Sequence, residues 1–248
     1  MTGIIIQART GSTRLPGKVL FPFGPSTMLE YCINRTLLSR LADTVIVATT
    51  TDPDDDAIQK LCEKKGVPVY RGPENDVLQR YIDAAQHFGI QVVVRVCADN
   101  PFIDPSYIDR LIEAYTRKPA DYYSFQFSSG VPAIMSPIGF FGELVTLKAL
   151  LSVKSNNAPP QFFEHVTQYV YRHPERYSVR YLPVPAGLES ARIRLTVDTK
   201  EDYAVALKAG RMIGFDVSVS ASAVYRAVLK RPDLMKKMHD QIQSNPKA

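Results

Sequence analysis

Short β-branched runs alternate with longer amphipathic segments along the first half of this sequence. Strands are predicted at residues 3–7, 44–49, 67–70 and 91–97, and helices at residues 28–41, 55–65, 76–88 and 106–115. The run at 91–97 is apolar apart from Gln91 and Arg95, and strands this apolar are covered on both faces. The alternation therefore predicts an α/β fold, in which helices lie on both faces of a mostly parallel sheet.

The second half of the chain begins with a change of pattern. Residues 120–160 contain "YYSFQFSSGVPAIMSPIGFFGEL", which is rich in aromatic residues, Ser, Gly and Pro. This composition predicts a small inserted β subregion of added strands or a hairpin at the edge of the sheet. The later elements are predicted as a helix at 161–172, a strand at 178–182, an apolar run at 193–197, a helix at 200–212 and one or two helices from residue 221. Without a repeat or a long linker, residues 1–248 are expected to form a single domain.

Composition excludes several classes of function. The three cysteines are widely spaced and form no C-x-x-C pair, which argues against a disulfide framework and a structural zinc site. No apolar run approaches the roughly 20 residues of a membrane helix, and the N-terminus lacks the pattern of a secretory signal. We therefore expect a cytoplasmic protein. The net charge of +5 is spread along the chain among acidic residues, which does not indicate nucleic-acid binding and suits a phosphorylated small molecule.

The loop after the first predicted strand, in "IIIQARTGSTRLPGKVL" at residues 4–20, has the features of a phosphate-binding loop. Gly11 and Ser12 let backbone N–H groups approach an anion. The cationic side chains of the loop are Arg9, Arg14 and Lys18. Five residues separate its glycines and Val19 follows the lysine, so it is not the ATPase loop; a dinucleotide-binding G-x-G-x-x-G is also missing. The alternative is a basic turn that needs glycine only for its backbone angles.

Two aspartates follow predicted strands directly, where open α/β sheets bind their ligands. Asp99 lies in "VVVRVCADNPFIDP" and Asp198 in "ARIRLTVDTKEDYAVA". A carboxylate at such a position can hold Mg²⁺, with water and substrate phosphates as further ligands. Alternatively, Asp99 forms an Asx turn and Asp198 or Thr199 caps the following helix. Two acidic loop ends together with a cationic glycine loop are what a nucleoside triphosphate and its metal require.

Five blocks carry a family resemblance: "IIIQARTGSTRLPGKVL", "DVLQRYIDAA", "VVVRVCADNPFIDPSYID", "FFEHVTQYV" and "RLTVDTKEDY". In these blocks the chain resembles the spore-coat polysaccharide biosynthesis protein F family. That family is similar to the acylneuraminate and Kdo cytidylyltransferases, which make CMP-sugars from CTP. The resemblance is close over residues 1–115 and moderate over 160–210. It implies a Rossmann-like three-layer nucleotidyltransferase fold and a CTP-dependent cytidylyltransferase.

The resemblance also implies roles for individual residues. The residues implied to bind the nucleotide are Ala8, Arg9, Gly11, Ser12, Arg14, Lys18, Arg71, Asp76, Arg80 and Ala98. The residues implied to act in catalysis are Arg14, Lys18 and Asp99, with Mg²⁺ held by Asp99 and Asp198. Glu164 and His165 are implied to lie near the acceptor. Asn100 and Arg194 are further acceptor candidates, and a spare arginine near Asp198 suits an anionic acceptor. Arg71, Asp76 and Arg80 lie where relatives recognise the base, and a solvated helix start is the alternative for these three. A packed or capping histidine is the alternative for His165.

The acceptor half of the chain departs from the family pattern. Many members carry an acidic stretch where this chain has "SSGVPAIMSPIGFF", so the acceptor half is expected to differ from that of the family. The expected acceptor is an acidic sugar or another anionic group, including a phosphate or phosphonate. The implied reaction moves CMP from CTP to that acceptor and releases pyrophosphate, in surface polysaccharide or glycoconjugate biosynthesis. A nucleotide-sugar-dependent glycosyltransferase and a non-catalytic nucleotide-binding protein are the alternatives. The segment at 120–160 is expected to be the surface of a homodimer or a wall of the acceptor pocket.

Overall fold

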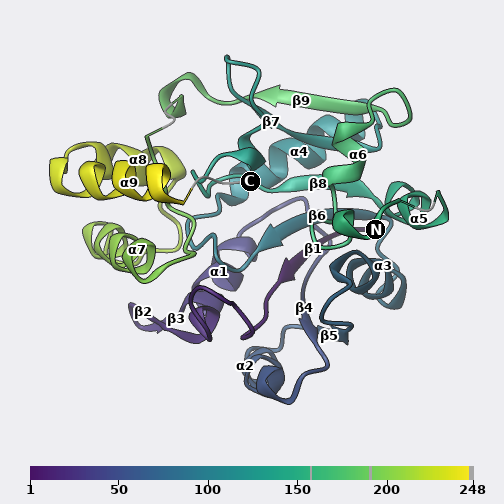
Figure 1. The fold of residues 1–248 in the computed structure, drawn as a ribbon, viewed down its shortest axis with the longest axis horizontal. Helices are drawn as coiled ribbons and strands as arrows, with labels where there is room; N and C mark the ends of the chain where they lie inside the picture. The colour runs from purple at the N-terminus through teal and green to yellow at the C-terminus, as the bar shows by residue number, and fades with distance from the viewer. Residues whose placement is uncertain (157, 190–191, 246–248) are drawn as a thin grey trace.

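A single sheet forms the centre of the computed structural model, which describes residues 1–156, 158–189 and 192–245 (Figure 1). Within these residues seven strands lie in the order β5-β4-β1-β6-β8-β7-β9. Their bounds are Thr2–Gln7 (β1), Thr44–Thr50 (β4), Val69–Gly72 (β5), Val92–Cys97 (β6), Tyr122–Gln126 (β7), Glu143–Thr146 (β8) and Val179–Pro183 (β9). A separate antiparallel pair consists of Pro22–Phe23 (β2) and Ser26–Thr27 (β3).

The expected mostly parallel sheet is confirmed. Strand β1 pairs in parallel with β4 and β6, and β4 pairs in parallel with β5. Strand β8 runs antiparallel to both β6 and β7, while β9 is parallel to β7. Residues 120–160 thus supply β7 and β8, which belong to the main sheet. The predicted added strands are present, but they lie inside the sheet, between β6 and the edge strand β9.

Helices cover both faces of the sheet, as predicted (Figure 1). Their bounds are Met28–Thr36 (α1), Asp56–Lys65 (α2), Val77–His87 (α3), Pro105–Arg117 (α4), Leu147–Ser155 (α5), Gln168–Arg172 (α6), Lys200–Met212 (α7), Ala221–Leu229 (α8) and Pro232–Ser244 (α9). Helices α3, α5 and α6 pack in one core cluster with Ile5, while Ile4 and Ile6 pack in the other. Because side chains alternate along a strand, β1 contributes to both cores. None of the helices of the described residues is long and apolar enough to cross a membrane.

Three predicted elements differ from the structure. The helix predicted at 28–41 ends at Thr36, because the Asp109 carboxylate of α4 accepts hydrogen bonds from Arg40 N and Leu41 N and fixes a loop there. The helix predicted at 161–172 is a 3₁₀ turn at Pro160–Phe162 followed by α6. The run at 193–197 forms no strand. It packs instead against Gly139, where a Cβ atom would lie 3.2 Å from the Leu195 backbone.

Candidate active site

The loop that follows β1 is held in shape by its own backbone. Thr10 O accepts hydrogen bonds from Ser12 N at 2.7 Å and from Gly17 N at 2.8 Å. Gly17 has φ +71°, in the left-handed region that favours glycine. A 3₁₀ turn at Lys18–Leu20 starts directly after it. The glycine therefore redirects the chain so that Lys18 points back under the loop.

Asp55 anchors this loop to β4. Its carboxylate accepts hydrogen bonds from the backbone N–H and the hydroxyl of Thr10, both at 2.7 Å, and from the hydroxyls of Thr49 and Thr50 at 2.9 and 2.5 Å. The side chain is buried. Burial acts to raise the pKa of Asp55, but the hydrogen bonds from the threonines outweigh it and lower the pKa below its ordinary value. Asp55 is therefore a charged anchor for the loop at neutral pH.

We expect Asp55→Asn to lower the free energy of unfolding by about 1–3 kcal/mol at pH 7, because the amide places donors against the donating threonines. Since the folded pKa is lowered, the charged carboxylate stabilises the fold above the unfolded pKa, and this stabilisation is lost as pH falls through the folded pKa. The difference between variant and wild type should therefore shrink on acidification. Denaturant unfolding at pH 7 and in acid measures it. The exposed neighbour in Asp54→Asn is the control, and an equal loss in both variants would contradict the anchor role.

Lys18 brings the two predicted metal-binding aspartates together. Its Nζ lies 3.0 Å from Asp99 Oδ2 and 3.3 Å from Asp198 Oδ1, and it donates to Val197 O at 2.7 Å. Burial acts to lower the pKa of Lys18, but the two carboxylates outweigh it and raise the pKa. The lysine is therefore a charged ammonium between two carboxylates. Arg14 also pairs with Asp198, at 3.0 Å.

The backbone places the Asp198 carboxylate at this point. Val197 N donates to Asp99 O at 2.9 Å. This backbone hydrogen bond joins the loop that follows β6 to the segment that precedes α7. Thr199, rather than Asp198, is the N-cap of α7 and forms a capping box with Asp202. Because Thr199 caps the helix, the Asp198 side chain is available to face Lys18 and Arg14.

The donor set fits a hard divalent cation. Two carboxylate oxygens from separate loops already share one positive charge, that of Lys18. Among the described residues no group of three or more His, Cys, Asp or Glu side chains could hold a metal. Mg²⁺ commonly takes one or two protein carboxylates and completes its octahedron with waters and substrate phosphates. Asp99 and Asp198 match that requirement.

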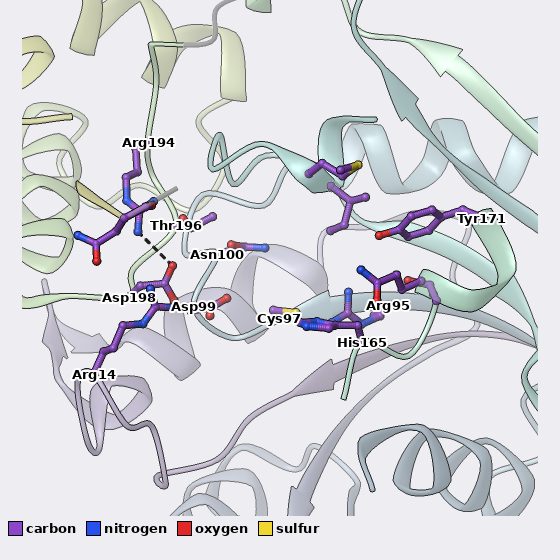
Figure 2. Close-up of a pocket in the computed structure, with 15 residues that line it drawn as sticks. Arg14, Arg95, Cys97, Asp99, Asn100, His165, Tyr171, Arg194, Thr196 and Asp198 are labelled. Atoms are coloured by element: carbon purple, nitrogen blue, oxygen red, sulfur yellow. Dashed lines mark hydrogen bonds and ion pairs between the residues drawn. The ribbon is translucent and has the colours of Figure 1, made fainter. Parts of the chain in front are cut away.

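Two adjoining cavities, each of about 290 Å³, open at this edge of the sheet. The residues that line the first cavity alone are Gln7, Ala8, Arg9, Ser12, Thr13, Lys18, Val19, Ala98 and Glu164. Those that line the second alone are Asn100, Ile134, Met135, Thr167, Gln168, Tyr171, Arg194, Thr196 and Asn245. The residues that line both are Arg14, Arg95, Cys97, Asp99, His165 and Asp198. The aspartates therefore lie where the two cavities meet. Figure 2 shows the second cavity, with both aspartates among its lining residues.

A cationic loop, two facing carboxylates and paired cavities are the geometry that a nucleotidyl transfer needs. Residues 3–218 match the family described as Cytidylyltransferase. The chain belongs to the cytidylyltransferase family. It is a CTP-dependent nucleotidyltransferase, which confirms the enzyme class and the family that the sequence blocks implied.

Relatives support this membership over most of the chain. The spore coat polysaccharide biosynthesis protein SpsF of Bacillus subtilis is 36% identical over 234 residues, which are 92% of this chain and 94% of that protein. A solved cytidylyltransferase from Leptospira borgpetersenii is 31% identical with a TM-score of 0.85, over 94% of this chain and 96% of that one. The 3-deoxy-manno-octulosonate cytidylyltransferase of Geobacter sulfurreducens is 34% identical over 118 residues, 47% of this chain and 46% of that protein. The first two likenesses include the acceptor half.

Most of the predicted site residues of this cytidylyltransferase lie together. The residues predicted to bind the nucleotide that also line the first cavity are Ala8, Arg9, Ser12, Arg14, Lys18 and Ala98. Asn100 and Arg194 line the second cavity, whereas Glu164 lies at the first. His165 lines both and is exposed in a turn rather than on a helix. Gly11 is exposed and is not in the lining of either cavity as described, so its contact with the nucleotide stays a prediction. An added Cβ atom at Gly11 would lie 3.1 Å from Glu74 Oε1.

Three nucleoside candidates have other partners in this cytidylyltransferase. Arg71 donates to Thr50 O at 2.8 Å and pairs with Asp56. Asp76 caps α3 and pairs with Lys154. Arg80 is buried and donates to Pro73 O at 2.6 Å. None of the three is in the lining of the two cavities as described, so their contact with the base stays a prediction.

Arg194 is fully engaged within the protein. Its Nε donates to Asp202 at 2.7 Å, Nη1 to Asn245 O at 3.0 Å, and Nη2 to both Asp198 and Asp202. The side chain is only 2% exposed. In this conformation Arg194 orients Asp198 instead of presenting free donors, and acceptor binding by Arg194 remains a prediction.

Sequence reasoning missed two charged groups that shape the site. Asp55 lies in an acidic run that is typical of a solvated helix start, and its burial depends on folding against Thr10. Arg95 is the one charged residue in an apolar strand, and the sequence shows this exception. The strand pattern alone, however, predicts no role for it. Its partner Glu143 comes from β8, 48 residues later. Only the antiparallel pairing of β6 with β8 places these two side chains together.

Proposed function

We propose that this cytidylyltransferase transfers CMP from CTP to an acidic sugar or another anionic acceptor, in surface polysaccharide or glycoconjugate biosynthesis. The observation that carries the proposal is the Lys18 ammonium between Asp99 and Asp198, at the boundary of two cavities. The first cavity would hold CTP and the second the acceptor. The reacting oxygen and the α-phosphorus would then meet beside the two carboxylates.

Positioning and charge neutralisation would account for most of the catalysis. An acceptor oxygen attacks the α-phosphorus in line, and pyrophosphate leaves. Arg9 and the loop backbone at Ser12 would hold the phosphates, while Arg14 and Lys18 would stabilise the charge that develops on them. Asp99 and Asp198 would hold Mg²⁺, which supplies charge neutralisation and lowers the pKa of a bound hydroxyl.

Two relatives motivate the choices of metal and acceptor. A solved Mycobacterium tuberculosis protein, Rv0371C, is described as a complex with manganese, and its 18% identity and TM-score of 0.59 establish a shared fold. A solved CMP:2-keto-3-deoxy-manno-octonic acid synthetase is described as complexed with CTP, at 18% identity and a TM-score of 0.64. The divalent cation of this family is proposed to be Mg²⁺ here, and the acceptor class to be sugar acids. The cytoplasmic location stays a prediction.

A pyrophosphate-release screen tests the proposed function. The four nucleoside triphosphates would each be offered with Mg²⁺ and a panel of sugar acids, sugar phosphates and phosphonates. We expect release with CTP and a sugar acid, and a CMP-sugar as the second product. CMP or CDP release from a finished nucleotide sugar without pyrophosphate would favour a glycosyltransferase. Tight CTP binding without turnover of any acceptor would favour a non-catalytic nucleotide-binding protein.

We propose that the segment at 120–160 forms a wall of the acceptor pocket and also part of the surface of a homodimer. Ile134 and Met135, in the 3₁₀ turn at Ala133–Met135, line the second cavity. The neighbouring Val131 is 44% exposed. Light scattering on the purified protein is expected to give the mass of a dimer, and a monomer at high concentration would contradict the dimer proposal while leaving the wall in place.

A further inference from the structure

Arg95 is an unusual residue for the place it occupies. It lies on β6 between β1 and β8, directly opposite Glu143 in the antiparallel register. The adjacent residues Val94 and Val96 face one core, so Arg95 faces the opposite side, which α6 and the turn at 163–167 cover. A charge in such a strand costs several kcal/mol unless it is paired and hydrogen-bonded.

A buried network holds the arginine. Arg95 Nη1 donates to Glu143 Oε2 at 2.7 Å, and the Glu143 side chain is fully buried. The other carboxylate oxygen accepts hydrogen bonds from the hydroxyls of Tyr122 at 2.5 Å and Thr167 at 2.8 Å. Burial and the charge of Glu143 raise the pKa of Tyr122 well above its ordinary value, so this hydroxyl remains a donor. Both oxygens of Glu143 are thus engaged, and the position of the guanidinium is fixed.

The guanidinium is only partly used by this network. A structural arginine–carboxylate pair is frequently bidentate, whereas Glu143 receives one bond from Arg95 Nη1. Arg95 Nε is buried without a partner among the described residues. The side chain keeps 11% of its surface exposed, and it lines both cavities. Arg95 therefore keeps a donor that Glu143 does not use, on a side chain that lines the space where the acceptor would lie.

The second cavity has further unmet polar atoms. Asn100 and Thr196 line it, and within the described part of the chain Asn100 Oδ1 and Thr196 Oγ1 are buried without a hydrogen-bond partner. Buried polar atoms without partners are rare in folded proteins and call for an explanation. Three residues with such atoms line this one cavity, Arg95 included, which points to a polar ligand rather than to an apolar one.

Arg95 lies across the cavity from the other cations. Figure 2 shows Arg14 and Arg194 beside Asp198, and Arg95 on the far side with His165 and Tyr171. Because Glu143 balances its charge, the pair has no net charge and suits a monoanion better than a dianionic phosphate. A guanidinium edge matches the planar geometry of a carboxylate.

We propose that Arg95, held by Glu143, Tyr122 and Thr167, binds the carboxylate of the sugar-acid acceptor. This inference rests on the proposed function and deepens it, because it assigns the residue that selects acids over neutral sugars. The same contact would turn the hydroxyl of the acceptor towards Asp99, four residues further along the chain. Arg95 is thus a specificity-determining residue of this enzyme.

The test compares an acid with its neutral analogue. The acceptors are 3-deoxy-manno-octulosonate, N-acetylneuraminate and the carboxamide of each, and pyrophosphate release gives kcat/KM. The variants are Arg95→Gln, Arg95→Lys and the double variant Arg95→Gln/Glu143→Gln, which removes both charges and keeps a hydrogen-bonded pair. We expect the wild type to prefer the acid by about 10- to 100-fold, and both variants that lack the arginine charge to prefer it less than about threefold. The KM for CTP should stay within about threefold of wild type.

The outcomes separate this proposal from its alternatives. If the pair is only structural, the double variant should recover thermal stability together with the full preference for the acid, which would overturn the assignment. An equal loss for acid and carboxamide would overturn it as well. If the pyrophosphate-release screen instead shows a preference for a sugar phosphate, and Arg95→Gln removes that preference, the group that Arg95 binds is a phosphate and the carboxylate assignment is wrong. If the wild type releases no pyrophosphate with any acid, the proposed function fails and the assignment fails with it.

Discussion

Asp99→Asn is expected to lower kcat by about 10²–10³-fold or more, with the fold intact. The asparagine keeps the size of the side chain but loses the charge that faces Lys18 and would hold the cation. Asp198 still pairs with Lys18 and Arg14, so the loops should remain in place. Steady-state pyrophosphate release over a range of Mg²⁺ concentrations measures the effect, and the thermal unfolding midpoint reports the fold.

Asp240→Asn is the matched control, because Asp240 is exposed on α9. It should leave kcat unchanged. The metal assignment would be wrong if Asp99→Asn kept Mg²⁺-dependent release at the wild-type rate. A loss of activity that accompanies a large fall in the unfolding midpoint would instead indicate a structural role for Asp99.

Lys18→Met is expected to give the second largest effect, a loss of about 10²–10³-fold in kcat/KM for CTP. The substitution removes the cation nearest both carboxylates, and it leaves Asp99 and Asp198 facing each other with less compensation. The apo protein should therefore also be less stable, by about 1–3 kcal/mol. Mg²⁺ should restore part of that stability in the variant and have a smaller effect on the wild type, because a divalent cation can replace the missing ammonium.

Thermal unfolding with and without Mg²⁺ measures this difference, and Lys148→Met on the exposed side of α5 is the control. Equal effects of Mg²⁺ on variant and wild type would contradict the shared-cation arrangement. If Lys18→Met kept the wild-type kcat/KM for CTP, the lysine would have no role in the reaction.

The sequence predicted most of the sheet and its helices because these depend on local periodicity. Helix α7 has the predicted bounds, residues 200–212, since Thr199 and Asp202 form its capping box within the segment itself. The predicted helix at 161–172 was wrong over its middle because apolar spacing alone does not reveal a turn that tertiary contacts stabilise. Thr167 in this turn donates to Glu143, a residue of a distant strand.

The amino-acid sequence by itself determined the fold class, the family, and the candidate loop and aspartates, because strand periodicity and contiguous blocks are properties of short segments. Only the tertiary structure decided which of these residues meet. It placed Lys18 between Asp99 and Asp198, joined Asp55 to Thr10 and paired Arg95 with Glu143 beside two cavities. Those contacts join residues tens to nearly two hundred positions apart. Burial and charge pairing at such separations depend on strand order and loop packing, which local sequence patterns do not contain.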